Sequence, residues 1–325
     1  MNMLDHFDQL YMLNKQKNEG NGEDSFFGSY DDTAAIVCVM DGSGGLGSMS
    51  YHSMGGKTGA FLASRTCCDA VRDWYFEQLK TKRKIQTDML KEHITRSYRK
   101  LTEYAKDKTE MKGDLIRDFP TTLACALLRQ EKRHIVLHAI WAGDSRVYQL
   151  CEEGLMACSI DDSNEPDAFE ALYDSPRMTN VLSSDGKYTL HHKKFNINGP
   201  CLILAATDGC FDCFYSPMHF EHAILEALLN NNNPNGFEQS LRDAIAQNAS
   251  DDFTLGIMSV GYGDYTNCQK HFRDRYHSIC KNYMDPIYRK LDEDGSQDEK
   301  IDYIQSLWAS GYKQNYEILW SKQHG

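Results

Sequence analysis

The chain alternates between short apolar runs and longer segments in which apolar residues recur every three or four positions. Residues 33–40 form an apolar run rich in β-branched side chains, which is typical of a buried strand. A glycine-rich loop follows over 42–56. Apolar residues then recur at helical spacing over 57–79 and again over 85–106. The pattern therefore predicts a strand, a loop and two paired helices, in this order.

The middle of the chain has a different texture. Three strand-like runs, "TTLACALL", "HIVLHAIWA" and "SRVYQL", are separated only by "RQEKR" and "GD". Strands that follow one another directly form hairpins, and hairpins form an antiparallel sheet. Two more apolar runs, "CLILAAT" and "FTLGIMSV", enclose two helix-like segments at about 217–229 and 237–247. We expect an α+β fold in which antiparallel strands are flanked by helices.

Two segments stand apart from this pattern. Residues 151–199, called the flap below, are irregular and polar and are long enough to cover a functional site, so we expect them to contact substrate. Beyond residue 263 the pattern is helical, with an acidic turn "DEDGSQDE" and an aromatic stripe that ends near Trp320. We expect a main domain at 1–262 and a helical C-terminal extension at 263–325.

Composition limits the range of partners. The formal charge of -12, from 47 acidic and 35 basic residues, disfavours binding to nucleic acid or to an anionic membrane. The opening "MNMLDHFDQLYML" lacks the basic start of a signal peptide, and no apolar run reaches the ~20 residues that span a bilayer. The eleven cysteines are typical of reduced thiols in a large intracellular protein. We expect a cytoplasmic location.

Acidic residues occupy the ends of several predicted strands. An isolated aspartate at such a position is usually a turn residue or a helix cap, but several at the ends of apolar strands favour a common site. Carboxylates that meet within a few ångström must be protonated or compensated by cations, and ligands that are all oxygen favour Mg²⁺ or Mn²⁺. The acids in question are Asp41, Asp144 and Asp208 after strands, Asp251 before the last strand, and Glu23 and Asp24 before the first.

These acids lie within a set of motifs that resembles a known family. "NGEDSFF", "VCVMDGSGG", "FPTTLACALL", "WAGDSRVYQL", "AATDGCFD" and "SDDFTLGIM" occur in the order found in metal-dependent protein phosphatases of the type 2C (PPM) family, most like its bacterial members. The resemblance covers about 21–260. It implies a four-layer α-β-β-α sandwich of two antiparallel sheets with helices outside. It also implies hydrolysis of phosphoserine and phosphothreonine in proteins, opposing a Ser/Thr kinase.

The resemblance also implies roles for single residues. Asp41 resembles the carboxylate that bridges two metal ions, with the Gly42 carbonyl as a ligand beside it, and Asp208 and Asp251 resemble ligands of the second ion. Asp24, with Glu23 as a less certain companion, resembles the acid that holds metal-bound waters. Asp144 resembles the contributor to a third, weaker site. The implied reaction is attack on phosphorus by a hydroxide that bridges two Mn²⁺ or Mg²⁺ ions, so Asp41, Asp208 and Asp251 would act through metal-activated water.

Two departures from the family pattern leave an alternative open. Animal members carry a histidine after Asp-Gly that is implicated in protonating the leaving group, and this chain has Ser43 there. His52 in the glycine-rich loop is a second candidate for this proton donor, although a histidine in a loop is more often a solvent-exposed residue without such a role. The arginine that holds phosphate in animal members is absent, and only Lys15 and Lys17 lie nearby. The alternative is a catalytically weak pseudophosphatase that binds phosphoproteins, although the retained metal carboxylates favour the enzyme.

Two further interpretations carry less weight. A small-molecule phosphatase of the haloacid dehalogenase type needs a parallel sheet and a second acid near the nucleophilic aspartate, whereas the residue two positions before Asp41 is Val39. "CFDC", Cys210 to Cys213, has redox spacing, but we interpret it as two packed thiols, with an oxidation-sensitive brake as a minor hypothesis.

Overall fold

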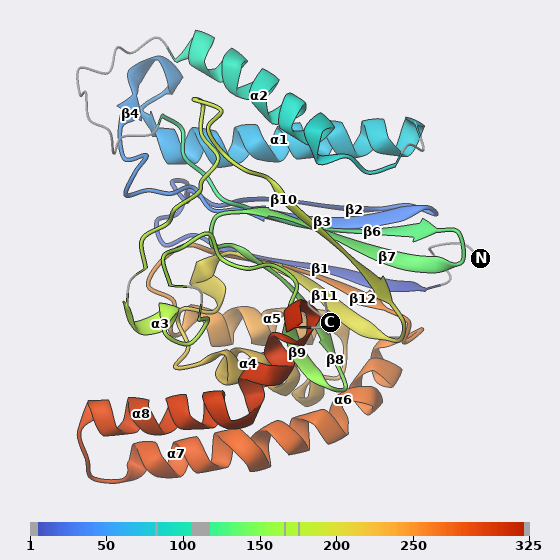
Figure 1. Cartoon of the computed structure of the whole chain (residues 1–325), viewed down its shortest axis with the longest axis vertical. Helices are drawn as coiled ribbons and strands as arrows, with labels where there is room; N and C mark the ends of the chain where they lie inside the picture. The colour runs from blue at the N-terminus through green and yellow to red at the C-terminus, as the bar shows by residue number, and fades with distance from the viewer. Residues whose placement is uncertain (1–5, 82–83, 106–117, 166, 175, 322–325) are drawn as a thin grey trace.

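A computed structural model of the chain describes residues 6–81, 84–105, 118–165, 167–174 and 176–321. Position 106 at the end of the second predicted helix, positions 166 and 175 of the flap and both chain ends lie outside the described residues. The described part contains two five-stranded antiparallel sheets that face each other, with helices on the two outer faces (Figure 1). This is the predicted four-layer sandwich, and its antiparallel strands do not fit the dehalogenase-type alternative.

The first sheet has the strand order β10-β7-β6-β3-β2. Its central strand, β6, pairs antiparallel with β7 in a register that runs from Leu123↔Ala142 to Glu131↔His134. Every residue of β3 is buried, since one face meets the opposite sheet and the other meets helices. The strands are β2 (Ser25–Tyr30), β3 (Ala34–Met40), β6 (Leu123–Glu131), β7 (His134–Ala142) and β10 (His191–Ile197).

The second sheet has the order β1-β12-β11-β8-β9. Strand β12 lies inside it and is buried along its whole length. The strands are β1 (Phe7–Lys15), β8 (Arg146–Cys151), β9 (Gly154–Ala157), β11 (Cys201–Ala206) and β12 (Phe253–Val260). A small separate hairpin is formed by β4 (Ser50–Tyr51) and β5 (Lys57–Thr58).

Helices cover the outer face of each sheet (Figure 1). On the first sheet lie α1 (Gly59–Thr81) and α2 (Thr87–Tyr104), whose buried stripe includes Trp74 and Tyr98. On the second lie α4 (Pro217–Asn230), α5 (Pro234–Ala246) and α6 (Tyr265–Ile279). The expectation of an irregular flap over 151–199 was wrong at both ends of the range, because β9 and β10 pair with neighbouring strands there, and the irregular part between them contains the short α3 (Ala171–Asp174). None of the described helices is both long and apolar enough to cross a membrane.

Local sequence explains where two of these helices begin. Ser216 caps α4 by accepting a hydrogen bond from the His219 amide, and Pro217 takes the first helical position, where no amide hydrogen is needed. Asn233 and Pro234 repeat this arrangement at α5, where Asn233 accepts from the Gly236 amide at 2.9 Å. The asparagine run before α5 is therefore a loop that ends in a helix cap.

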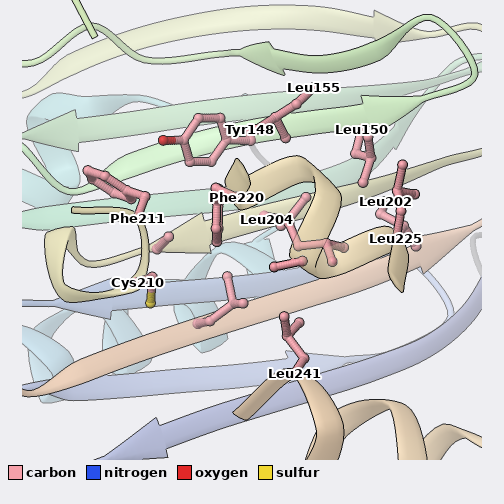
Figure 2. Close-up of a cluster of buried hydrophobic side chains, with 14 of the residues drawn as sticks. Tyr148, Leu150, Leu155, Leu202, Leu204, Cys210, Phe211, Phe220, Leu225 and Leu241 are labelled. Atoms are coloured by element: carbon pink, nitrogen blue, oxygen red, sulfur yellow. The ribbon is translucent and has the colours of Figure 1, made fainter. Parts of the chain in front are cut away.

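The C-terminal extension continues the helical layer under the second sheet. Helix α6 runs through a π-helical turn (Cys280–Met284) into α7 (Asp285–Asp292), and α8 (Gln297–Leu307) returns antiparallel to it (Figure 1). A second π-helical turn (Trp308–Tyr312) leads to α9 (Lys313–Tyr316) and α10 (Ile318–Ser321). Figure 2 shows part of a hydrophobic cluster that includes the strand residues Tyr148 and Leu204. Trp308, Tyr312 and Tyr316 are buried in the same cluster. The extension therefore packs on the second sheet and its helices.

Candidate active site

Three carboxylates meet at one end of the sandwich. Asp41 follows β3 of the first sheet, Asp144 lies in the β7–β8 turn, and Asp208 follows β11 of the second sheet. Each offers an oxygen that lies within 4.8 Å of the other two. The Asp41 amide donates to Thr122 Oγ1 at 3.0 Å, and Thr122 in turn bonds Ser145 at 2.6 Å, so the corner after β3 is tied to the β7–β8 turn.

The electrostatics of this cluster fit a divalent cation. Burial, followed by repulsion from Asp208, raises the pKa of both Asp41 and Asp144 well above the usual range. Burial also raises the pKa of Asp208. Asp144 Oδ1 is buried and has no hydrogen-bond partner among the described residues. Carboxylates this crowded must gain protons or a cation, and an all-oxygen donor set suits Mg²⁺ or Mn²⁺.

Asp24 and Glu23 occupy different depths beside the cluster. Asp24 is buried, and its Oδ2 accepts hydrogen bonds from Thr254 at 2.8 Å and Thr207 at 3.0 Å. Burial, opposed by the Thr254 hydrogen bond and reinforced by Asp208, raises the pKa of Asp24 to about 7. Glu23 instead lines the cleft above the cluster and accepts a hydrogen bond from the Thr58 hydroxyl.

The two adjacent acids before β12 play different parts. Asp252 accepts hydrogen bonds from the backbone amides of Lys17 at 2.6 Å and Glu23 at 2.5 Å, so it fixes the segment that carries Asp24. Asp251 is exposed and lines the same cleft, outside the three-carboxylate cluster. Sequence reasoning singled out Asp251 and missed Asp252, because two neighbouring acids in a loop give no signal of which way each one faces.

The two Asp-Gly corners need glycine because other backbone passes close by. A Cβ atom at Gly42 would lie 2.6 Å from the Ala60 carbonyl oxygen, and one at Gly209 would lie 2.1 Å from the Asp252 carbonyl oxygen. These contacts are shorter than any side chain tolerates, and backbone atoms cannot move away as a flexible side chain can. Gly42 therefore lets the first turn of α1 lie against the corner after Asp41, and Gly209 lets the loop before β12 lie against the corner after Asp208.

A cleft of about 860 Å³ opens above the three carboxylates, and we call it the acidic cleft. Arg177 of the flap is exposed, is the only Lys or Arg among the lining residues, and forms no ion pair within the described part of the chain. Ser43 Oγ is buried there without a described partner. The lining consists of Glu23, Asp41, Gly42, Ser43, Gly44, Gly45, Leu46, Asp144, Asn164, Arg177, Met178, Thr179, Val181, Asp208, Asp251 and Asp252.

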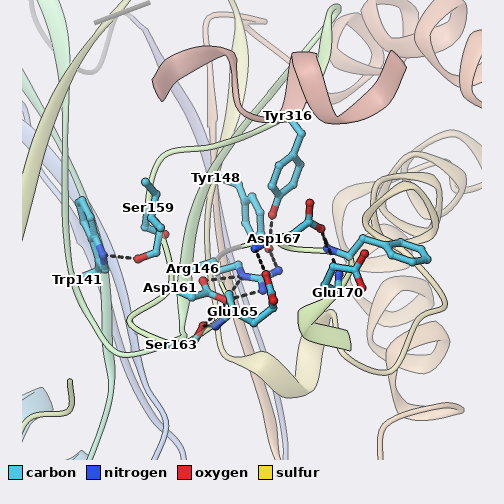
Figure 3. Close-up of polar contacts among 12 residues, drawn as sticks. Trp141, Arg146, Tyr148, Ser159, Asp161, Ser163, Glu165, Asp167, Glu170 and Tyr316 are labelled. Atoms are coloured by element: carbon cyan, nitrogen blue, oxygen red, sulfur yellow. Dashed lines mark hydrogen bonds and ion pairs between the residues drawn. The ribbon is translucent and has the colours of Figure 1, made fainter. Parts of the chain in front are cut away.

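The arginine of the "GDSR" motif points away from this cleft into the protein. Arg146 is buried, and its guanidinium binds both carboxylate oxygens of Asp161, with the shortest contact at 2.6 Å (Figure 3). The next residue, Asp162, accepts from the Gly143 amide at 3.0 Å. The start of the flap is thus bound to both sides of Asp144. Sequence reasoning missed Asp161 because it lies in an irregular segment.

The remaining sequence candidates lie farther from the chemistry. His52 is exposed in the loop before α1 and does not line the acidic cleft. Cys210 is buried, with its thiol against the Thr254 carbonyl, and all eleven cysteines are free. Burial raises the pKa of Cys210 well above the usual range and that of Cys213 to about 12. Thiols with a raised pKa are poorly reactive, which favours packing over a redox brake.

Comparison with known proteins identifies the family. A family model described as protein phosphatase 2C matches residues 14–246. The chain belongs to the protein phosphatase 2C family. The Asp-Gly corners and the "GDSR" turn described above all fall inside the matched residues, whereas the C-terminal extension lies outside them. No curated protein matches the sequence.

Solved structures of bacterial phosphatases share the fold of this protein phosphatase 2C chain. The PPM Ser-Thr phosphatase MsPP from Mycobacterium smegmatis is 15% identical, with a TM-score of 0.52 over 78% of this chain and 99% of its own. The serine/threonine phosphatase Stp1 from Staphylococcus aureus is 16% identical, with a TM-score of 0.55 over 77% of this chain and 94% of its own. At this identity the likeness concerns the fold.

Proposed function

We propose that the protein is a metal-dependent phosphatase that removes phosphate from phosphoserine and phosphothreonine in proteins. The observation that carries this proposal is the meeting of Asp41, Asp144 and Asp208 within 4.8 Å at the floor of a cleft, in a chain of the protein phosphatase 2C family. The activity is assigned to residues 1–262, with 263–325 as a helical extension. We further propose a cytoplasmic location and a Ser/Thr kinase that the phosphatase opposes.

Two Mn²⁺ or Mg²⁺ ions are assigned to the acids around the cleft. Asp41 would hold both ions, with the Gly42 carbonyl as a ligand beside it. Asp208 and Asp251 would be ligands of the second ion, and Asp144 would contribute to a third site. When bound, such ions neutralise charge on the phosphate and lower the pKa of water for attack on phosphorus. The raised pKa of Asp41 and Asp144 supports this assignment, because a cation would relieve the repulsion that keeps protons on these groups.

The role proposed for Asp24 is to hold metal-bound waters beside the cluster. Its carboxylate is fixed by hydrogen bonds from the hydroxyls of Thr207 and Thr254, so its position relative to the cluster is set by β11 and β12. Glu23 is the second candidate for this role, and unlike the buried Asp24 it lines the cleft. Neither residue needs to form a covalent intermediate.

The flap is proposed to bind the substrate. It brings Asn164, Arg177 and Thr179 to the acidic cleft, and Arg177 provides a positive charge for the phosphate where the family's upstream arginine is absent. A guanidinium is well suited to this role, because its planar fork donates two hydrogen bonds to phosphate oxygens. The proposed partner is a phosphorylated protein, whose chain would lie along the flap.

A second candidate function rests on Ser43. A hydroxyl at this position is a weak proton donor for a leaving group, so the protein would bind phosphoproteins and turn them over slowly, as a pseudophosphatase. Aryl phosphates distinguish the two candidates, because their leaving group needs little protonation. The enzyme would hydrolyse both an aryl phosphate and a phosphothreonine peptide efficiently, whereas the pseudophosphatase would hydrolyse the aryl phosphate but turn the bound peptide over only slowly.

The test uses two substitutions that keep the size of the side chain. With Mn²⁺ present, Asp41→Asn and Asp208→Asn should each lose most of the rate of phosphothreonine peptide hydrolysis. Asp69→Asn, at an exposed position on α1, is the control and should keep the wild-type rate. Wild-type rates in both active-site variants would refute the proposal.

A further inference from the structure

Part of the flap lies against the C-terminal extension, and we call this part, residues 167–174, the flap tip. Asp167 Oδ2 accepts hydrogen bonds from Lys313 Nζ at 2.6 Å and from Trp308 Nε1 at 3.3 Å. Both donors belong to the extension, which lies outside the residues that the family model matches. The side chain of Asp167 is only 17% exposed, so water screens its ion pair with Lys313 only in part. This pair therefore restrains the tip more than a fully exposed ion pair would.

The same carboxylate also fixes the shape of the tip. Asp167 Oδ1 accepts hydrogen bonds from the backbone amides of Phe169 at 2.8 Å and Glu170 at 3.1 Å (Figure 3). The ring of Phe169 is buried and stacks on that of Trp308, with 6.5 Å between the ring centroids. Glu170 in turn accepts a hydrogen bond from Gln305 of the extension. One oxygen of Asp167 thus orders the tip, and the other binds it to the extension.

Two short paired segments join the tip to the acidic cleft. Asn164 shortly precedes the tip and Arg177 shortly follows it, and both residues line the cleft. The Asn164 amide donates to the Arg177 carbonyl at 3.1 Å, and the Arg177 amide donates to Asn164 Oδ1 at 2.5 Å. Ser163 and Met178 form the next pair of this ladder. Because so few residues separate them, a change in the position of the tip would shift Arg177.

The other end of the paired segments is fixed to the main domain. Asp161 and Asp162 bind residues on both sides of Asp144. The tip also touches the main domain, where the Tyr173 hydroxyl donates to the Tyr215 carbonyl at 2.9 Å in an exposed contact. Loss of the contact with the extension would therefore leave the pair nearest the tip, which contains Arg177, as the end that frays first.

We propose that Lys313 is a positioning residue for substrate binding, because through Asp167 it holds the flap tip, and with it Arg177, in place at the acidic cleft. This inference rests on the phosphatase function proposed above, in which Arg177 binds the phosphate of the substrate. None of the described residues of the extension lines the acidic cleft, so the extension acts on substrate affinity only through the flap.

Steady-state kinetics of the full-length protein with Mn²⁺ and a phosphothreonine peptide test this role. Lys313→Met removes the charge and keeps a side chain of similar length, and it should raise the KM about threefold with little change in kcat. Lys313→Arg should recover most of the affinity, because it restores a charged donor to Asp167. The matched control is Lys290→Met, since Lys290 lies in the same extension and pairs there with Glu293 at 3.0 Å. Equal KM values for Lys313→Met and Lys290→Met would overturn the proposal.

A double substitution tests whether Lys313 acts through Arg177. In an Arg177→Met background, Lys313→Met should change the KM less than about twofold, because the group that it positions is already absent. A rise in KM that is as large in this background as in the wild type would show that Lys313 acts elsewhere, and it would refute the proposal.

Hydrogen exchange followed by mass spectrometry tests the restraint without relying on catalysis. In Lys313→Met, the amides of Asn164 and Arg177 should exchange at least about threefold faster than in the wild type, while the amides of β12 keep their rates. Equally faster exchange in β12 would indicate a general loss of stability and overturn the assignment, and so would faster exchange at Asn164 with an unchanged KM.

The two proposals fail in different ways. A wild-type protein that hydrolyses no phosphopeptide refutes the phosphatase function and, with it, the role of Lys313 in substrate binding. An active wild type whose KM and exchange rates are unchanged in Lys313→Met refutes the role of Lys313 alone.

Discussion

The Glu221 carboxylate, fully buried on α4, accepts two hydrogen bonds from the Arg275 guanidinium on α6, at 2.5 and 2.9 Å. The same carboxylate accepts from the Leu155 amide of β9 at 3.1 Å and from the Tyr312 hydroxyl of the C-terminal extension. One side chain thus joins the second sheet, two of its helices and the extension. Because these hydrogen bonds link the extension to the main domain, we expect the two parts to unfold together.

Glu221→Gln should destabilise the protein by about 3 kcal/mol, because it leaves the buried charge of Arg275 without its counterion. The substitution keeps the shape of the side chain and removes only the charge. Urea unfolding followed by circular dichroism measures the change in unfolding free energy.

The control is the exposed pair of Arg72 and Asp69 on α1, whose nitrogen–oxygen distance is 2.9 Å. Asp69→Asn should cost less than about 1 kcal/mol, since water already solvates both groups. Equal losses in Glu221→Gln and Asp69→Asn would show that burial of the Glu221 pair adds nothing.

His219 should make the protein less stable in mild acid. It is buried near the start of α4, beside Tyr215, Tyr288 of α7, Ser216 and His222, and burial lowers its pKa from 6.5 to about 4. Below pH 6.5 the unfolded chain takes up a proton that the folded protein refuses, so stability falls until the pH reaches about 4. The expected loss through His219 at pH 5, relative to pH 7.5, is about 2 kcal/mol.

His219→Gln should remove this loss, and urea unfolding at the two pH values measures it. The matched control is His134→Gln, because His134 is exposed on β7, and this variant should keep the wild-type difference between the two pH values. An unchanged difference in His219→Gln would contradict the assignment of the acid sensitivity to this residue.

Arg177→Met should raise the KM for a phosphothreonine peptide about tenfold and change kcat much less. The reason is that the charge-assisted hydrogen bond from Arg177, which this variant lacks, would stabilise the bound phosphate equally in the ground state and in the transition state. Steady-state kinetics with Mn²⁺ separate the two constants. Arg177→Lys should recover part of the affinity, since it restores the charge without the planar fork.

Arg273→Met serves as the matched control, because Arg273 is exposed on α6 and does not line the acidic cleft. It loses the same charge and should leave both constants unchanged. A KM for Arg177→Met that equals that of the control would remove this residue from the proposed substrate site.

The sequence predicted best those elements whose burial is uniform. The strands β3, β11 and β12 are buried along their whole length, and their apolar runs are visible without any knowledge of the fold. The type of fold followed from strands in direct succession, and the family motifs placed Asp41, Asp144 and Asp208 at strand ends that the structure brings together.

Edge strands and the flap were not predictable in the same way. β1, β2 and β10 carry polar or exposed residues at many positions, and β10, "HHKKFNI", pairs only with β7 at the sheet edge. Their strand structure depends on a neighbour that lies far away in the sequence. Arg177 was missed for a related reason, because no periodic pattern fixes the path of an irregular segment such as the flap.

The most direct test of the central claim is the dependence of phosphothreonine peptide hydrolysis on divalent cations. Phosphate release by the purified protein is measured first in EDTA and then during titration with Mn²⁺ or Mg²⁺. We predict no release above background in EDTA and a rate that rises to saturation as either ion is added, because Asp41, Asp144 and Asp208 repel one another unless a cation lies among them. Equal rates in EDTA and in saturating Mn²⁺ would contradict the account.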